Sequence, residues 1–326
     1  MTPLLLTLAL GAGLIAFAVL GPWLLRRAAP ALMRVPRLAI GVIAGGILVW
    51  LGTLLAMGPV LAWWGSGPVL LPGRAAEVCQ RCLAASNPFG AGVGAGQTAI
   101  PAVLLLAAPT VLTLALVIGV AVQMVRRPQR SRAAARRVLQ AAERRRIHGF
   151  DVSLVDSERR FAFTFPGRHG GIVLSTGTLR SLDRDELTAV LAHEHAHLRQ
   201  RHHLISAVVA SFAALLRWVP VVRAAADALP HYLEIAADNA GRRQAGTPAL
   251  VSALIKLGER ASPVAAHAGA AALHAAGPER VRQLVRPPAG LAGAAPATLI
   301  GASLLVLALA SAAVHLPYAS AALAGC

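Results

Sequence analysis

Four long apolar runs constrain the fold of this chain more than any other feature of its sequence. They cover residues 3–25, 38–64, 98–125 and 297–316, and each is close to or above the ~20 residues that a helix needs to cross the hydrocarbon core of a bilayer. The chain has 326 residues, of which 56% are hydrophobic and 14% charged, a balance that is rare in water-soluble domains. The first run is too long for the apolar part of a cleaved signal peptide and has no basic residue before it, so we expect four retained membrane helices.

The arginines predict the orientation of these helices. Arginines 26, 27, 34 and 37 lie between the first and second runs, and six more follow the third run. By the positive-inside rule, both of these loops are cytoplasmic and both chain termini are outside. Thirteen of the fourteen acidic residues also follow the third run and precede the fourth. The sequence therefore predicts a membrane domain over 1–125, a cytoplasmic domain over 126–296, a fourth span over 297–316 and a short external tail over 317–326.

The net charge of +17 does not by itself indicate a nucleic-acid partner. The arginines gather at the ends of the apolar runs, where such residues contact lipid headgroups, and the sequence has no basic motif interleaved with aromatic residues. We therefore expect the lipid bilayer as a partner and no direct nucleic-acid binding. Cys79, Cys82 and Cys326 all fall on the side predicted to be external, which allows a disulfide or free thiols and assigns them no function.

A candidate metal site lies in the predicted cytoplasmic domain. His193, Glu194 and His197 form the pattern H-E-x-x-H, and residues four apart on a helix lie on the same face. The two imidazoles would supply half of a tetrahedral zinc site, with Glu194 beside them to activate a water molecule. The alternative is a set of histidines on a solvated helix, in a chain that has eleven of them.

Two further patterns favour the metal site. Asp183 and Glu186 are spaced as a capping box, which predicts that the H-E-x-x-H segment is helical. Downstream, Glu234 and Asp238 share a helical face; Glu234 would complete the ligand set for one Zn²⁺ per chain and leave the fourth position open. Asp238 is placed to accept the spare N–H of a ligand histidine. His231, one turn before Glu234, is a candidate for contact with the transition state.

The rest of the cytoplasmic domain is predicted to be mixed α and β. Residues 130–146 predict an amphipathic helix on the inner leaflet. Short strands are expected at 152–155, 161–165 and 171–175, and their sheet could offer an edge to an extended peptide. The Ala/Gly/Pro-rich stretch over 261–296 predicts a linker with one short helix at 279–285. Three further histidines are expected to face solvent or headgroups rather than bind metal: His195, His202 and His203.

An apolar segment at 204–222 separates the two halves of the candidate site. A single membrane crossing would put the two halves on opposite sides of the bilayer. Two crossings need ~40 residues, whereas thirty-six lie between His197 and Glu234. The segment is therefore either a buried helix or a hairpin that dips into the membrane and returns, and we favour a helix packed between the catalytic domain and the spans.

These motifs resemble those of the membrane-bound gluzincin peptidases. The similarity is carried by H-E-H-A-H, by the residues L-R-Q-R-H-H that follow it at 198–203, and by E-I-A-A-D at 234–238. Three spans before the zinc domain and one after it are similar to the BlaR/MecR-type antirepressor peptidases. The resemblance implies an α+β zinc endopeptidase domain in which His193, His197 and Glu234 bind the metal and Glu194 is the general base.

The resemblance also suggests substrates and rival functions. Similarity to the antirepressor peptidases implies that the substrate is a cytoplasmic repressor of the BlaI type and that the protein acts in signal transduction. Only ten residues follow the fourth span, so we expect no β-lactam sensor on this chain. The HtpX-type quality-control peptidases share the motif but usually carry spans between its two halves, which the spacing here disfavours. A third alternative is a non-catalytic membrane scaffold with a structural zinc, for which the carboxylate of Glu194 would have no use.

Overall fold

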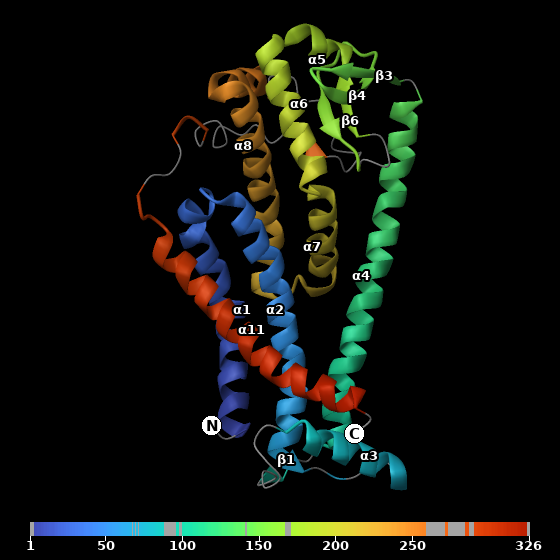
Figure 1. Ribbon diagram of the computed structural model, residues 1–326, viewed down its shortest axis with the longest axis vertical. Coiled ribbons are helices and arrows are strands. Elements are labelled where there is room, and N and C mark those ends of the chain that lie inside the picture. The colour runs from blue at the N-terminus through green and yellow to red at the C-terminus, as the bar shows by residue number, and fades with distance from the viewer. Residues whose placement is uncertain are drawn as a thin grey trace.

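The structure, a computed structural model, is an elongated helical bundle with a small β-sheet at one end. Both chain termini lie at the other end, away from the sheet (Figure 1). The structure describes residues 3–66, 68, 70, 72–87, 96–97, 100–140, 142–166, 171–258, 271–272, 284–286 and 290–324.

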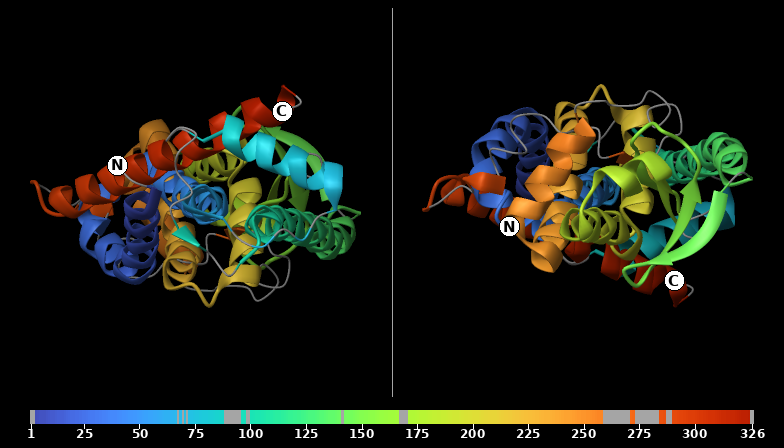
Figure 2. Two further views of the ribbon diagram at one scale, coloured as in Figure 1. Left: turned by 90° about the horizontal axis from the view of Figure 1, so that it is seen from below. Right: turned by 90° about the horizontal axis from the view of Figure 1, so that it is seen from above.

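Within these residues, four helices are long and apolar enough to cross a membrane, at the positions that the sequence predicts. Helices α1, α2 and α11 pack against one another, whereas α4 packs against α2. Seen along the long axis, α1 and α4 lie on opposite sides of the bundle with α2 between them (Figure 2). The four helices are α1 (Pro3–Leu32), α2 (Pro36–Trp64), α4 (Ala102–Leu139) and α11 (Ala294–Leu323).

Short elements join α2 to α4 at the end where the termini lie. They are β1 (Gly65–Ser66), α3 (Gly73–Ala85) and β2 (Gly96–Gln97), and β1 pairs with β2 in parallel. Cys82 in α3 is part of a disulfide, one of the two states that the sequence left open. Most of the short helix predicted at 279–285 lies outside the described residues.

The sheet at the opposite end has the strand order β3-β4-β6-β5-β7. Strands β4 and β6 pair in parallel and the other neighbours are antiparallel. Its buried side chains share a core with α5 (Thr176–Ser181) and α6 (Arg184–Arg199). The three predicted strands are confirmed. The strands are β3 (Ala142–Ile147), β4 (Phe150–Val155), β5 (Ala162–Thr164), β6 (Ile172–Ser175) and β7 (Ala271–Ala272).

The helix predicted at 130–146 is wrong in its second half. Helix α4 continues without a break to Leu139, and residues 142–147 form β3 instead. Arginine is a good helix former, so the Arg-rich run suggested a helix. The strand is set by the turn that follows it: His148 and Gly149 have φ of 48° and 86°, as a two-residue type I′ hairpin turn requires. The charged side chains of β3 suit the edge of a sheet, where they oppose pairing with another chain.

The apolar segment at 204–222 is a hairpin rather than one packed helix. Helix α7 (His202–Leu216) runs from α6 toward the spans, and α8 (Pro220–Gly258) returns beside it (Figure 1). The first part of α8 shares one buried core with α1, α2, α7 and α11. Helix α7 packs against α4 and α8, as favoured from the sequence, but the segment also holds the turn and the start of α8; entry of that turn into the membrane stays a prediction.

The tip of this hairpin reaches the level of the membrane helices. Leu215 and Val221 lie against Gly119 of α4 and Gly21 of α1, each within 2.9 Å of where a Cβ would stand. Gly119 is seven residues before Arg126 and Gly21 is five residues before Arg26, which corresponds to ~10 and ~8 Å along a helix. Trp218 at the tip is 77% exposed. A tryptophan next to arginine is typical of the membrane–water interface.

We expect Trp218 to contact lipid. A fluorophore attached to Trp218→Cys, in a chain whose native cysteines are replaced by serine, should be quenched by brominated lipids in nanodiscs. Arg184→Cys, at the exposed start of α6 beyond the hairpin, is the matched control and should respond to a water-soluble quencher instead. If the water-soluble quencher acts equally on the fluorophores at both positions, the tip of the hairpin lies outside the membrane interface.

Candidate metal centre

Helix α6 carries the H-E-x-x-H motif, and its start is fixed by the predicted capping box. The Asp183 carboxylate accepts from the backbone N–H of Glu186 at 2.9 Å, and the Glu186 carboxylate accepts from the N–H of Asp183 at 2.9 Å. These bonds satisfy donors that a helix start otherwise leaves unpaired. The motif therefore lies within a regular helix, as its spacing requires.

The same glutamate ties α6 to α8. Lys256 donates to the Glu186 carboxylate at 2.7 Å and Ser252 donates to it at 2.5 Å. Burial acts to raise the pKa of Glu186, but these hydrogen bonds and that from the Asp183 backbone outweigh it and hold the pKa below its usual value. Glu186 is therefore a charged, buried link between the two helices of the site.

Helices α6 and α8 run antiparallel and approach closely where α8 has a glycine. A Cβ at Gly241 would lie 2.8 Å from the carbonyl oxygen of Ala189 in α6. One turn further along, Asp238 faces His193, and Glu234 faces His197. The absence of a side chain at Gly241 thus lets the two ligand-bearing faces meet.

His193, His197 and Glu234 come together as the sequence predicts. The two Nε2 atoms are 3.2 Å apart, and the Glu234 carboxylate oxygens lie 3.5 Å from that of His193 and 3.6 Å from that of His197. Ligands of a tetrahedral zinc with bonds of about 2.0–2.2 Å are separated by about 3.3–3.6 Å. The observed spacings, of which the two to Glu234 involve its Oε2 and its Oε1 respectively, are close to those of one face of a zinc coordination tetrahedron.

In both His193 and His197, the Nδ1 atom, which is the ring nitrogen turned away from Glu234, also has a partner. His193 Nδ1 donates to the buried carboxylate of Asp238 at 3.0 Å, the contact expected from the sequence. His197 Nδ1 lies 2.9 Å from Nδ1 of His202, which the sequence placed at the surface and which is 1% exposed. That expectation is wrong for His202. Burial lowers the pKa of His197 to about 2, with the neighbouring His193 adding to the effect, so its ring is neutral and able to bind a metal.

Glu194, next to His193 in the motif, is fully buried, and one of its carboxylate oxygens meets the sheet. The hydroxyl of Thr164 in β5 donates to its Oε2. Thr164 is itself fully buried and was not found from the sequence, because a threonine in a short apolar strand carries no signal beyond strand propensity. The contact fixes the orientation of the Glu194 carboxylate.

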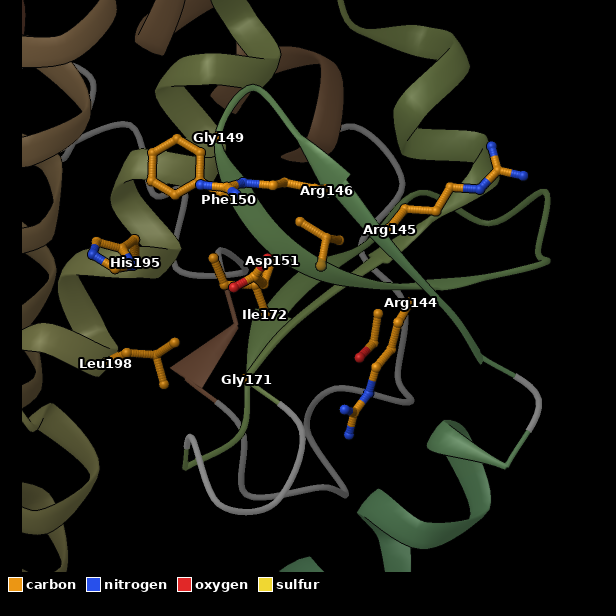
Figure 3. A pocket seen from close by; sticks show the side chains of 12 residues that line it. Arg144, Arg145, Arg146, Gly149, Phe150, Asp151, Gly171, Ile172, His195 and Leu198 are labelled. Carbon is orange, nitrogen blue, oxygen red and sulfur yellow. The ribbon is translucent and has the colours of Figure 1, made fainter.

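Two other histidines lie away from the triad. His231 is exposed on α8, where its ring stacks edge-on with Tyr232 at 5.8 Å, and its proposed contact with the transition state stays a prediction. His195 is about 200° around α6 from His193 and points into a separate hollow of about 640 Å³ between α6 and the β3–β4 hairpin (Figure 3). Its ring meets Phe150 at 5.4 Å. His195 therefore cannot join the triad, as expected.

Part of the chain, including the candidate site, is similar in sequence to known peptidases. Residues 126–287 match the model of peptidase family M48. Proteins named protease HtpX homolog are similar over shorter stretches: that of Thermodesulfovibrio yellowstonii is 39% identical over 71 residues, or 21% of this chain and 25% of the relative. The homolog of Thermococcus kodakarensis is 35% identical over 80 residues, or 22% of this chain and 27% of the relative. No solved structure matches the chain.

The chain thus spans about a quarter of the length of these relatives. The matched region contains the triad, and together with the four apolar helices it supports a membrane-associated metallopeptidase. The BlaR/MecR-type assignment is not confirmed. The relatives carry the HtpX name instead, which was the alternative. The spacing argument against that type assumed two full membrane crossings, and the α7–α8 hairpin shows a shorter way to join the two halves of the site.

We expect Gly241→Ala to disturb the metal site without touching a ligand. The new methyl group must push α8 away from the Ala189 carbonyl, at a cost of about 1–3 kcal/mol for overpacking. Zinc affinity, measured by competition with a chromophoric chelator, should fall together with the melting temperature. Gly45→Ala is the control, since nothing lies within 4 Å of its Cβ. Wild-type zinc affinity in Gly241→Ala would show that the close approach does not position the ligands.

Glu186→Gln should destabilise the protein in a pH-dependent way. Glutamine can keep the cap but loses the ion pair with Lys256, at a cost of about 1–2 kcal/mol for a partly exposed pair. Because the folded pKa of Glu186 is below its usual 4.5, its stabilising effect is complete above that pH and is lost as the pH falls further. The difference in melting temperature between wild type and variant should be largest near neutral pH and shrink below about pH 4.5. A difference in melting temperature that does not change with pH would contradict a stabilising role of the charged Glu186 carboxylate.

Proposed function

We propose that this protein is a membrane-embedded zinc metalloendopeptidase of the HtpX-like quality-control type. The observation that carries the proposal is the convergence of His193, His197 and Glu234 on one point, with Glu194 beside them. Their donor atoms are spaced for one zinc ion, and His₂Glu with an open fourth position is the ligand set of catalytic rather than structural zinc.

The chemistry proposed is hydrolysis of a peptide bond. When bound, the zinc ion supplies Lewis acidity, which polarises the scissile carbonyl and acidifies the attacking water. Glu194 takes the proton from that water and passes it to the leaving amine. Thr164 holds the Glu194 carboxylate in place through its hydrogen bond. Asp238 holds the ring of His193 so that its Nε2 faces the metal.

The sheet suggests how a substrate is held. β5 is the strand that contacts Glu194, and its outer edge pairs antiparallel with β7, where Thr164 stands opposite Ala271. This pairing indicates that an extended backbone fits antiparallel along β5. A substrate peptide that pairs with β5 would take the place of this two-residue contact, which makes unfolded or extended segments the favoured substrates.

The location of the site favours substrates in or near the membrane. The turn between α1 and α2 touches the end of α6, where Arg37 donates to Gln200 at 3.2 Å. Arginines 26, 27, 34 and 37 are all at this end of α1 and α2, so by the positive-inside rule the catalytic domain is cytoplasmic. The names of the relatives favour quality control over cleavage of a BlaI-type repressor. We therefore propose damaged or unfolded membrane-proximal proteins as the substrate class.

Glu194→Gln separates catalysis from metal binding. The variant should keep bound zinc, measured by atomic absorption of the purified full chain, while cleavage of unfolded casein falls by about 10²–10⁴-fold. Glu234→Gln is the companion variant: it removes a ligand, so zinc affinity itself should fall.

The two variants should differ in the property that is lost first: cleavage in Glu194→Gln and zinc affinity in Glu234→Gln. Wild-type cleavage by Glu194→Gln would refute the hydrolytic role of Glu194. Unchanged zinc affinity in Glu234→Gln would remove Glu234 from the ligand set. A wild-type protein that holds zinc but cleaves neither casein nor unfolded membrane proteins would support the structural-scaffold alternative.

A further inference from the structure

His202 makes a buried polar contact that the mechanism above does not use. It is the first residue of α7, and its ring meets that of His197 edge-on, with centroids 4.7 Å apart and planes at 86°. The two Nδ1 atoms are 2.9 Å apart. Among the described residues, His202 Nε2 has no hydrogen-bond partner, so the Nδ1 contact is what fixes this ring.

The turn before His202 is built to make this contact. Arg201 has φ 54° and ψ 37°, in the left-handed region, which is unfavourable for a residue with a side chain. This conformation interrupts the helix between α6 and α7, and the residue five positions after His197 then lies against its ring. Unfavourable backbone geometry persists where surrounding contacts outweigh it, and such positions gather at functional sites.

A metal bound to His197 decides which of the two histidines donates in this hydrogen bond. If His197 binds zinc through Nε2, its proton must be on Nδ1, and that proton needs an acceptor. We propose that His202 is a positioning residue: its Nδ1 accepts the Nδ1–H of His197 and so fixes the tautomer and the ring orientation in which Nε2 faces the metal. This inference rests on the proposed zinc site.

The two ligand histidines would then be held in different ways. His193 donates to a carboxylate, Asp238, on α8, whereas His197 donates to an uncharged imidazole on α7. A neutral acceptor orients the ring without adding a second negative charge next to Glu234. Loss of His202 should therefore weaken zinc binding through disorder of His197, and an uncharged acceptor of suitable shape should restore it.

Zinc affinity of the full chain in nanodiscs tests the proposal. His202→Leu keeps the volume and removes the acceptor; its zinc dissociation constant should rise about 10–100-fold. His202→Asn places an amide oxygen near the position of Nδ1 and should stay within a few-fold of wild type. His203→Leu, at the next position of the same helix, is the matched control and should leave the constant unchanged. Visible spectra of the Co²⁺-loaded proteins report the coordination geometry independently of activity.

Each outcome of these measurements either supports or overturns the proposed role of His202. Wild-type zinc affinity and Co²⁺ spectrum in His202→Leu would overturn the proposal, as would equal weakening in folded His202→Leu and His202→Asn, since packing rather than an acceptor would then be at work. If His202→Leu does not fold, His202→Asn decides alone: retained affinity supports the proposal and a tenfold loss overturns it. A wild-type chain that binds zinc tightly but cleaves nothing would overturn the proposed function and leave this inference standing.

Discussion

The close antiparallel packing of α6 and α8 is the constraint on which the rest of the site depends. The ligands come from two helices separated by the whole α7 segment, so neither helix can form the site alone. Three successive turns meet in register: Gly241 against Ala189, Asp238 against His193, and Glu234 against His197. Since donor atoms of a zinc site must agree to within a few tenths of an ångström, the backbone contact at Gly241 matters as much as the ligands themselves.

The membrane helices take part in this packing. The buried core around Leu229, Leu233 and Ala236 of α8 is continuous with side chains of α1, α2 and α11. Glu234 lies in the middle of this stretch, so the helix that supplies the third ligand is held by the spans on one face and by α6 on the other. The domain that carries the candidate site is thus not a separate globule attached to the long apolar helices. Its metal ligands and its spans share one core.

The sequence predicted the parts of the site that depend on the spacing of residues within a single helix. The H-E-x-x-H pair, the capping box at Asp183 and Glu186, and the Glu234–Asp238 face all follow from helical periodicity, and all are found in the expected contacts. The four apolar helices follow from length and composition alone.

What the sequence could not predict depends on tertiary contacts. Thr164 reaches Glu194 only because the sheet packs against α6, and His202 reaches His197 only because Arg201 adopts a left-handed conformation. Strand β3 was taken for helix because its arginines favour one, while its conformation is set by a two-residue turn and by pairing with β4. The return of the chain from α7 into α8 does not follow from residue counting, which excludes two full crossings but does not place the turn.

The hairpin links the long apolar helices directly to the candidate metal site. His202 is at the start of α7, Glu234 and Asp238 are on α8, and the turn between these helices lies among α1 and α4. Three of the six groups around the proposed metal position therefore belong to a unit whose far end contacts the long apolar helices. Packed interiors deform little and transmit displacement, so a shift of this unit along the bundle would move the carboxylate and the His202 acceptor relative to the histidines of α6. The same α6–α8 contact that builds the site thus makes its geometry depend on how the hairpin packs among the long helices.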